Sequence, residues 1–120
     1  MRFIFFILFS FDIAYSRCHP ITWESLSTKL NQDRNWDEIV FFASWCASCK
    51  PHLLSATTQS ILISTLDTPT ESEATLQALQ INSKIKCFID EKGTIREKLG
   101  VKNLPMKITR SDSSKILNTP

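Results

Sequence analysis

The sequence has no excess of charge of either sign. Its 120 residues include 14 Lys and Arg and 12 Asp and Glu, which leaves a net charge of +2. Acidic and basic residues are interspersed, and no Lys/Arg run exceeds two residues. Proteins that follow a nucleic-acid backbone present a basic stripe to the phosphates. The sequence therefore argues against nucleic acid as a partner.

The sequence also lacks the length for two domains and an apolar run long enough to cross a membrane. With 120 residues and a hydrophobic content of 42%, it suits one compact domain. The most apolar stretch, over 3–11, is too short to span a bilayer as a helix. A single functional site is expected.

The beginning of the chain has the pattern of a secretory signal peptide. Arg2 precedes the apolar stretch, and an Ala-Tyr-Ser triplet at 14–16 fits a cleavage site. We expect a leader over 1–16 and one domain over 17–120. A buried N-terminal strand is the alternative, but a phenylalanine-rich run without alternation makes a poor sheet edge. Export would place the protein in the periplasm or another extracytoplasmic space, where disulfides persist.

Two of the four cysteines form a C-x-x-C pair. Cys46 and Cys49 follow an apolar run over 39–42 that reads as a strand buried on both faces. We expect a helix from about Ala47 towards Thr58. On a first helical turn the two sulfurs lie on the same side and can close a reversible disulfide. Unpaired N–H groups at the helix start stabilise a thiolate on Cys46, which is therefore the candidate nucleophile.

The sequence lacks a second ligand pair of the kind that a zinc site needs. A zinc ribbon requires another C-x-x-C or a pair of histidines, and the remaining candidates lack that spacing: Cys18, His19, His52 and Cys87. We expect no metal and no other cofactor. Redox catalysis by Cys46 and Cys49 is favoured over a permanent disulfide or half of a metal site.

Two segments resemble the thioredoxin superfamily. The stretch over 41–50 is similar to the family's aromatic-rich strand followed by W-C-x-x-C-K, and 100–105 resembles its G-V-x-x-x-P segment. Between them, a strand ending near Asp67, a helix and an inserted element over 85–93 have the layout of TlpA/ResA-type extracytoplasmic thiol-disulfide oxidoreductases. The resemblance covers about residues 36–118. It implies an α/β, thioredoxin-like fold with a central mixed sheet flanked by helices.

The resemblance implies roles for residues around the cysteines. Pro105 would be a cis proline that exposes the Leu104 backbone for pairing with an extended substrate beside Cys46. An ordinary trans turn proline is the alternative. Trp45 would shield the disulfide and line the substrate groove, and simple packing explains it nearly as well.

The base that thioredoxins use for their second cysteine is replaced here. Six residues before Cys46, where thioredoxins bury an aspartate, the chain has Val40. In the TlpA/ResA type a carboxylate three residues after the second cysteine often does this work, and here that position is His52. Since histidine can move a proton near neutral pH, His52 is the candidate base. A surface histidine without a role is the alternative.

The sequence also gives expectations for the other two cysteines and for the remaining helices and strands. Cys18 and Cys87 either form a structural disulfide, tying the mature N-terminus to the inserted strand, or stay two separate thiols. Residues 17–20 read as irregular. We expect helices over 23–31, 69–80 (capped by Thr68) and 94–99, and further strands over 60–66, 84–89, 106–109 and 115–117. The C-terminal helix of thioredoxins is expected to be missing.

These features predict an exported thiol-disulfide oxidoreductase that acts on protein thiols and disulfides and has an upstream redox partner. A specialised reductant, with cytochrome c maturation as one candidate process, is favoured over an oxidant. Ala47 and Ser48 match neither the Gly-Pro of reducing thioredoxins nor the Pro-His of strong oxidants, so the direction of electron flow stays open. The alternative is a catalytically idle thioredoxin-fold binding module that holds a partner with its proline loop and uncovered sheet face.

Overall fold

The computed structural model describes residues 17–33 and 35–111. The expected leader over 1–16 and the expected last strand over 115–117 lie outside the described residues. The chain is helical at Arg110 and Ser111, directly after β5, and the rest of the stretch to which the expected absence of a C-terminal helix applies lies outside the described residues. Within the described ranges, no helix is long and apolar enough to cross a membrane.

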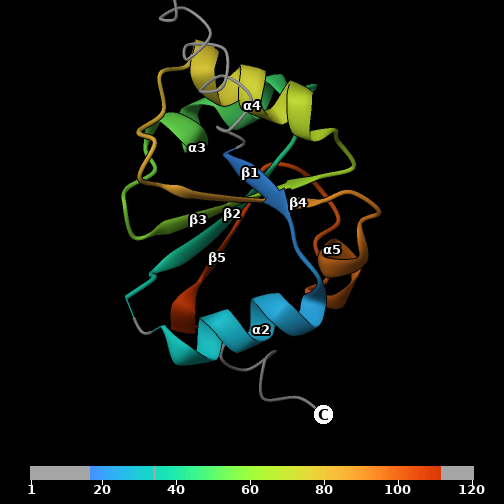
Figure 1. Cartoon of the computed structure of the whole chain (residues 1–120). Helices are drawn as coiled ribbons and strands as arrows, with labels where there is room; N and C mark the ends of the chain where they lie inside the picture. The colour runs from blue at the N-terminus through green and yellow to red at the C-terminus, as the bar shows by residue number, and fades with distance from the viewer. Residues whose placement is uncertain (1–16, 34, 112–120) are drawn as a thin grey trace, which may run out of the picture.

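A five-stranded mixed sheet forms the centre of the domain (Figure 1). Its strands are β1 (Cys18–Pro20), β2 (Glu38–Phe42), β3 (Ser60–Thr65), β4 (Lys86–Asp90) and β5 (Met106–Thr109). They lie in the order β1-β4-β3-β2-β5. β1, β4, β3 and β2 are parallel to one another, and β5 is antiparallel to β2.

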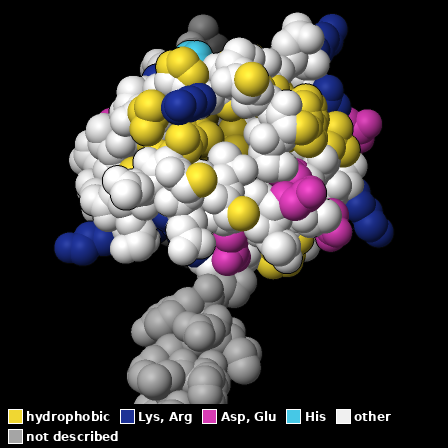
Figure 2. Space-filling model, turned by 90° about the horizontal axis from the view of Figure 1, so that it is seen from above, with side chains coloured by type: hydrophobic (Ala, Val, Ile, Leu, Met, Phe, Trp, Pro, Cys, Tyr) yellow, Lys and Arg dark blue, Asp and Glu magenta, His cyan; other side chains and the backbone are white. Residues whose placement is uncertain are grey.

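Helices flank the sheet on both sides (Figure 1). On one side lie α3 (Lys50–Leu54), which follows the 3-10 turn η1 (Ala47–Cys49), and α4 (Pro69–Ala78). On the other side lie α2 (Trp23–Gln32) and α5 (Thr94–Lys98). This arrangement confirms the predicted α/β architecture, a mixed central sheet flanked by helices. On the α3 and α4 side, hydrophobic side chains gather at the surface and a Lys or Arg side chain lies across them (Figure 2).

The sheet separates two hydrophobic cores, which explains why β2 is apolar at consecutive positions. Val40 and Phe42 pack with residues of α3 and α4, whereas Ile39 and Phe41 pack with residues of α2 and α5. All four side chains are fully buried. Successive side chains of a strand point to opposite faces of the sheet, so a strand covered on both faces needs apolar residues at successive positions, as the sequence predicted.

The helix starts that depend on local capping are confirmed. The Thr22 side chain accepts a hydrogen bond from the Ser25 N–H at 3.1 Å at the start of α2. At the start of α4, Thr68 Oγ1 accepts from the Glu71 N–H at 3.2 Å. These bonds satisfy N–H groups that have no partner inside the helix, and they can be read from the sequence because both partners are close in the chain.

The expectation that residues 17–20 are irregular is wrong, because β1 lies there. This three-residue strand pairs in parallel with β4, and Cys18 is opposite Cys87. The strand is short and two of its side chains, His19 and Pro20, are exposed. Its pairing partner is far away in the sequence, so local residue preferences gave no sign of it.

The helix after the cysteines is shorter than predicted. It ends at Leu54 instead of continuing towards Thr58, and the Ser55 N–H bonds back to the Pro51 carbonyl at 3.1 Å. Pro51 lies in the first turn of α3, where a missing N–H costs nothing. Pro51 is therefore compatible with a regular helix at this position.

Candidate functional site

The C-x-x-C cysteines form a disulfide just beyond the carboxyl end of β2. The Cys46 N–H donates to the Ala43 carbonyl at 3.1 Å, and the Cys49 N–H donates to the Cys46 carbonyl at 3.1 Å. These two turns fold the chain back so that the Cα atoms of Cys46 and Cys49 are 5.4 Å apart and the sulfurs are bonded. The separation is the usual one for a disulfide.

The two sulfurs of this disulfide differ in their access to solvent. Cys49 is 0% exposed and belongs to the core on the α3 and α4 side, whereas Cys46 is only partly buried. Ser48 Oγ lies 3.6 Å from Cys46 Sγ, where its hydroxyl can donate to a thiolate. Cys46 is also the N-cap of η1, next to first-turn N–H groups that have no partner inside the helix. Of the two cysteines, Cys46 is therefore the one that solvent reaches.

Trp45 stands at the surface beside the disulfide. Its side chain is 63% exposed, and its indole N–H donates to the Leu66 carbonyl at 3.3 Å. The exposed indole adds little to either core, which disfavours simple packing as the reason for this residue. The hydrogen bond joins the loop after β2 to the loop after β3.

The proline segment lies at the same edge of the sheet as the disulfide. Strand β5 is antiparallel to β2 and begins at Met106, opposite Phe41, so the residues just before it lie at the carboxyl end of β2. The Leu104–Pro105 peptide bond is cis. Leu104 and Cys46 pack against the same core. The fold thus brings together the segments that the sequence analysis assigned to one site.

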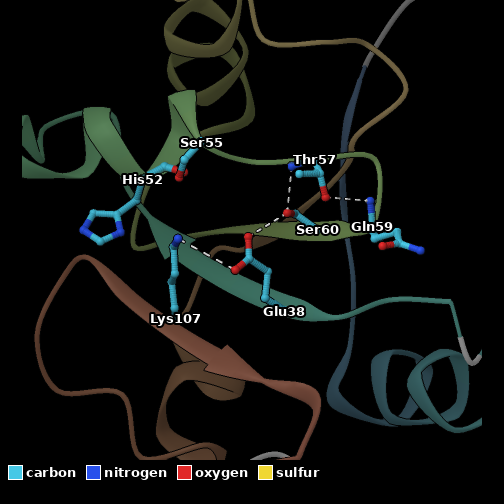
Figure 3. A network of polar contacts seen from close by, with 7 residues as sticks. All are labelled: Glu38, His52, Ser55, Thr57, Gln59, Ser60 and Lys107. Atoms are coloured by element: carbon cyan, nitrogen blue, oxygen red, sulfur yellow. Dashed lines mark hydrogen bonds and ion pairs between the residues drawn. The ribbon is translucent and has the colours of Figure 1, made fainter.

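His52, the candidate base, is half-buried on α3 and is not joined to the cysteines by a hydrogen bond. Its carbonyl accepts from Ser55 Oγ at 3.1 Å. Among the described residues, its imidazole makes no hydrogen bond, and the ring points away from Glu38 and Lys107 (Figure 3). The assignment of His52 as a base therefore stays a prediction.

Asp67 is a site residue for which the sequence analysis proposed no role. It follows β3, is only 6% exposed, and its carboxylate accepts from the Ser44 N–H at 2.6 Å, Ser44 Oγ at 3.0 Å and the Thr68 N–H at 2.9 Å. Ser72 Oγ donates to it at 3.1 Å and accepts in turn from Ser64 Oγ at 2.6 Å. Because the carboxyl ends of parallel β2 and β3 meet at one edge, an acidic residue just after β3 was the available signal.

The hydrogen bonds keep Asp67 ionised. Burial raises the pKa of this carboxyl, but the backbone and side chain of Ser44, the backbone of Thr68 and the hydroxyl of Ser72 lower it more, so that the pKa lies below its usual value. The charge is thus held by fixed donors. Asp67 fastens the loop that carries Trp45 and Cys46 to the end of β3 and the start of α4.

A second polar network, also missed, crosses the sheet under α3 (Figure 3). Glu38 accepts from Ser60 Oγ at 2.7 Å and lies 3.7 Å from the Lys107 ammonium. Glu38 is two residues before Val40 on the same strand, and Lys107 is opposite Val40. A carboxylate therefore occurs on this face of β2, displaced from the position that the family resemblance implies.

Cys18 and Cys87 form the second disulfide. They are an in-register pair of β1 and β4, both are buried, and they belong to the same core as Cys49. The Arg17 guanidinium donates to the carbonyls of Ile81, Asn82 and Ile85, and the Cys18 N–H donates to Glu73 at 3.0 Å. The bridge and these bonds tie the edge strand to the domain.

No group of three or more His, Cys, Asp or Glu side chains is placed to hold a metal ion within 17–33 and 35–111. No model of a known protein family matches the chain, and no curated protein is significantly similar to it. The thioredoxin-like assignment thus stays a prediction. The sheet order, the cis proline and the position of the disulfide are compatible with it.

Proposed function

We propose that this protein is a thiol-disulfide oxidoreductase that exchanges electrons with protein disulfides through Cys46 and Cys49. The observation that carries the proposal is the asymmetry of the pair: Cys46 is accessible, and Cys49 is buried behind it at 0% exposure. A structural bridge has no need of one reachable sulfur, whereas exchange needs an accessible nucleophile and a shielded resolving thiol.

Two sulfur displacements make up the reaction in the reducing direction. The Cys46 thiolate attacks one sulfur of a substrate disulfide, which forms a mixed disulfide and releases the other substrate sulfur as a thiolate. The Cys49 thiolate then attacks Cys46 Sγ, closes the Cys46–Cys49 disulfide and releases the second substrate sulfur. The substrate is reduced and the protein pair is oxidised. A dithiol of an upstream redox partner restores the reduced pair by the same steps.

Neighbouring residues support each step. The hydroxyl of Ser48, 3.6 Å from Cys46 Sγ, stabilises the attacking thiolate. Cys49 must lose its proton before it attacks, and His52 is the candidate that accepts it. The Leu104 backbone and Trp45 contact the extended substrate chain. Since only sulfurs carry the electrons, the reaction needs no cofactor.

The finer assignment is an exported, TlpA/ResA-type reductant. The Cys18–Cys87 disulfide supports an oxidising, extracytoplasmic location, because such bridges are rare where thiols are kept reduced. The two-residue spacer Ala47-Ser48 and the partly buried Cys46 are compatible with either direction of electron flow.

The reduction of insulin tests the proposal. The reduced wild type should accelerate the precipitation of insulin chains, Cys46→Ser should abolish the effect, and Cys49→Ser should accumulate a mixed disulfide between Cys46 and insulin. Cys18→Ser/Cys87→Ser is the matched control and should stay active. If the wild type neither reduces insulin nor forms a mixed disulfide with it, the protein is the idle binding module instead.

A further inference from the structure

The contacts that anchor the first strand of the sheet begin at Arg17, the residue that follows the expected leader. The Arg17 guanidinium donates to three carbonyls of the segment between α4 and β4, those of Ile81, Asn82 and Ile85. The next residue, Cys18, is bonded through its sulfur to Cys87. These partners are 64 to 69 residues away in the sequence. The fold therefore fixes the chain from the first residue of the expected mature protein onwards.

Glu73 of α4 binds the chain at the same point. Its Oε2 atom accepts from the Cys18 N–H at 3.0 Å. Burial lowers the pKa of the Arg17 guanidinium, and the charge of Glu73 opposes that effect, so the carboxylate also acts on Arg17. The backbone nitrogen of Arg17 is three covalent bonds from the Cys18 nitrogen. It therefore lies close to the same carboxylate.

A polar cavity of about 470 Å³ lies beside Arg17 and Glu73. Its other lining residues are Gln77, Gln80, Ile81 and Ser83, none of which carries a charge. A carboxylate with amide and hydroxyl oxygens near it can accept hydrogen bonds from a small cation, whereas an ammonium group without such acceptors is costly to bury. The cavity thus offers room and acceptors for a charged amino group at the start of the chain.

We propose that Glu73 binds the α-ammonium group of Arg17 in the processed protein. Processing adds water across the Ser16–Arg17 peptide bond, so that Ser16 leaves with the new carboxylate and Arg17 gains the protonated amine. A leader-cleaving peptidase catalyses this hydrolysis, and the ion pair with Glu73 exists only after it. The inference rests on the proposed export and not on the redox chemistry.

Edge strand β1 is the element that this ion pair stabilises. The strand has three residues, and at the edge of the described sheet its pairing neighbour is β4. Short edge strands fray easily because few backbone bonds hold them. Cys18 of β1 and Cys49 belong to the same hydrophobic core, so fraying of β1 would open the core around the buried cysteine of the C-x-x-C pair. Cleavage of the leader therefore completes the packing of the domain.

The reactivity of the α-amino group tests the proposal. The full chain is exported from a bacterial host, and mass spectrometry of the purified protein should find Arg17 as its first residue. The rate at which the native α-amine is acetylated is then measured against pH. A neighbouring carboxylate favours the charged form, so the pKa of this amine should lie above its usual range of about 7.7–8.0. At pH 7 the wild type should react about 3- to 10-fold more slowly than Glu73→Gln.

Glu73→Gln keeps an oxygen that can accept from the Cys18 N–H and removes only the charge. The matched control is Glu91→Gln, at an exposed carboxylate that does not line the cavity, and it should react at the wild-type rate. A second readout is the melting temperature, which should be about 2–4 °C higher in the wild type than in Glu73→Gln at pH 7.

The difference in melting temperature should shrink as the pH rises to 10. Because the folded-state pKa of the amine is raised, its contribution is present below the unfolded-state value of about 8 and is lost as the pH rises through the folded-state value. The wild type and Glu73→Gln share every other titratable group, so the comparison isolates this pair. The part that remains at pH 10 belongs to the Arg17 guanidinium, which keeps its charge.

Three results would overturn the inference. The first is an exported protein that begins at any residue other than Arg17. The second is an α-amine that reacts equally fast in the wild type and in Glu73→Gln. If Glu73→Gln does not fold, the wild type decides alone, and an α-amine pKa within or below the usual range is the third. Insulin reduction is measured separately, so failure of the redox proposal leaves these outcomes unchanged.

Discussion

Asp67 shows at the scale of one residue how a buried charge positions the loop that carries Cys46. All of its partners donate to it: two backbone N–H groups, from Ser44 and Thr68, and the hydroxyls of Ser44 and Ser72. The two N–H groups bond to different carboxylate oxygens. Only a side chain that accepts on both oxygens fits this site.

Asp67→Asn should therefore lower the free energy of unfolding by about 2 kcal/mol, because in either amide orientation one backbone N–H faces an NH₂ group and stays unsatisfied. Denaturant unfolding measures the change. The control is Asp37→Asn, at an exposed carboxylate, which should change stability by less than about 0.5 kcal/mol. Equal effects at the two positions would show that the donors around Asp67 contribute nothing specific.

The same carboxylate should make the protein sensitive to acid. Because the folded-state pKa of Asp67 is lowered, its stabilising contribution is fully present above the unfolded-state pKa of about 3.9 and is lost as the pH falls through the folded value. As the pH falls below about 4, the unfolding free energy of the wild type should fall more steeply than that of Asp67→Asn. Parallel curves for the two proteins would contradict the lowered pKa.

His52 gives the prediction on proton transfer. His52→Ala should slow the Cys49-dependent resolution of a mixed disulfide by about 100-fold, as loss of a general base does, and should leave alkylation of Cys46 unchanged. Quenched-flow trapping of the mixed disulfide measures the first rate. An unchanged resolution rate would show that His52 is not the base. Glu38, the carboxylate on the α3 face of β2, would then be the next candidate.

At the scale of elements, edge strand β1 depends on contacts that are distant in the sequence. Its three residues pair with β4, and its disulfide joins positions 69 residues apart. In the chain-entropy description, closing a loop of this length restricts the unfolded chain and contributes about 4 kcal/mol.

Cys18→Ser/Cys87→Ser should thus lower the melting temperature markedly, while the rate at which reduced Cys46 is alkylated stays within about twofold of the wild type. Calorimetry and mass-spectrometric labelling give the two values. If Cys18 and Cys87 are both alkylated in the native oxidised protein, the bridge is absent in solution and this account of β1 is wrong.

The elements also show what a sequence can predict. The helix starts at Thr22 and Thr68 were predictable, because a cap and its partner are three residues apart. Strand β1 was not, since its partner comes from the other half of the chain. The end of α3 was overestimated because the residues up to Thr58 tolerate a helix, and the turn that replaces it depends on Ser60 Oγ, which accepts from the Thr57 N–H at 2.9 Å.

At the scale of the whole molecule, the sheet brings four separated segments to one edge. The loops after β2 and β3, the start of α4 and the proline segment before β5 meet around Cys46. The cysteine motif and the proline segment could be predicted, the first from its spacing and the second from the family resemblance. The role of the Asp67 carboxylate could not be predicted, because it arises from partners that only the fold supplies.

The central claim is that Cys46 and Cys49 form a reversible redox couple with Cys46 as its nucleophile, and thiol mapping in glutathione buffers tests it most directly. The protein is equilibrated across a range of redox buffers, alkylated briefly and analysed by peptide mass spectrometry. We predict that Cys46 and Cys49 convert together between disulfide and dithiol, that Cys46 is alkylated first, and that Cys18–Cys87 stays oxidised throughout. A Cys46–Cys49 bridge that persists in buffers reducing Cys18–Cys87, or faster labelling of Cys49, would contradict the claim.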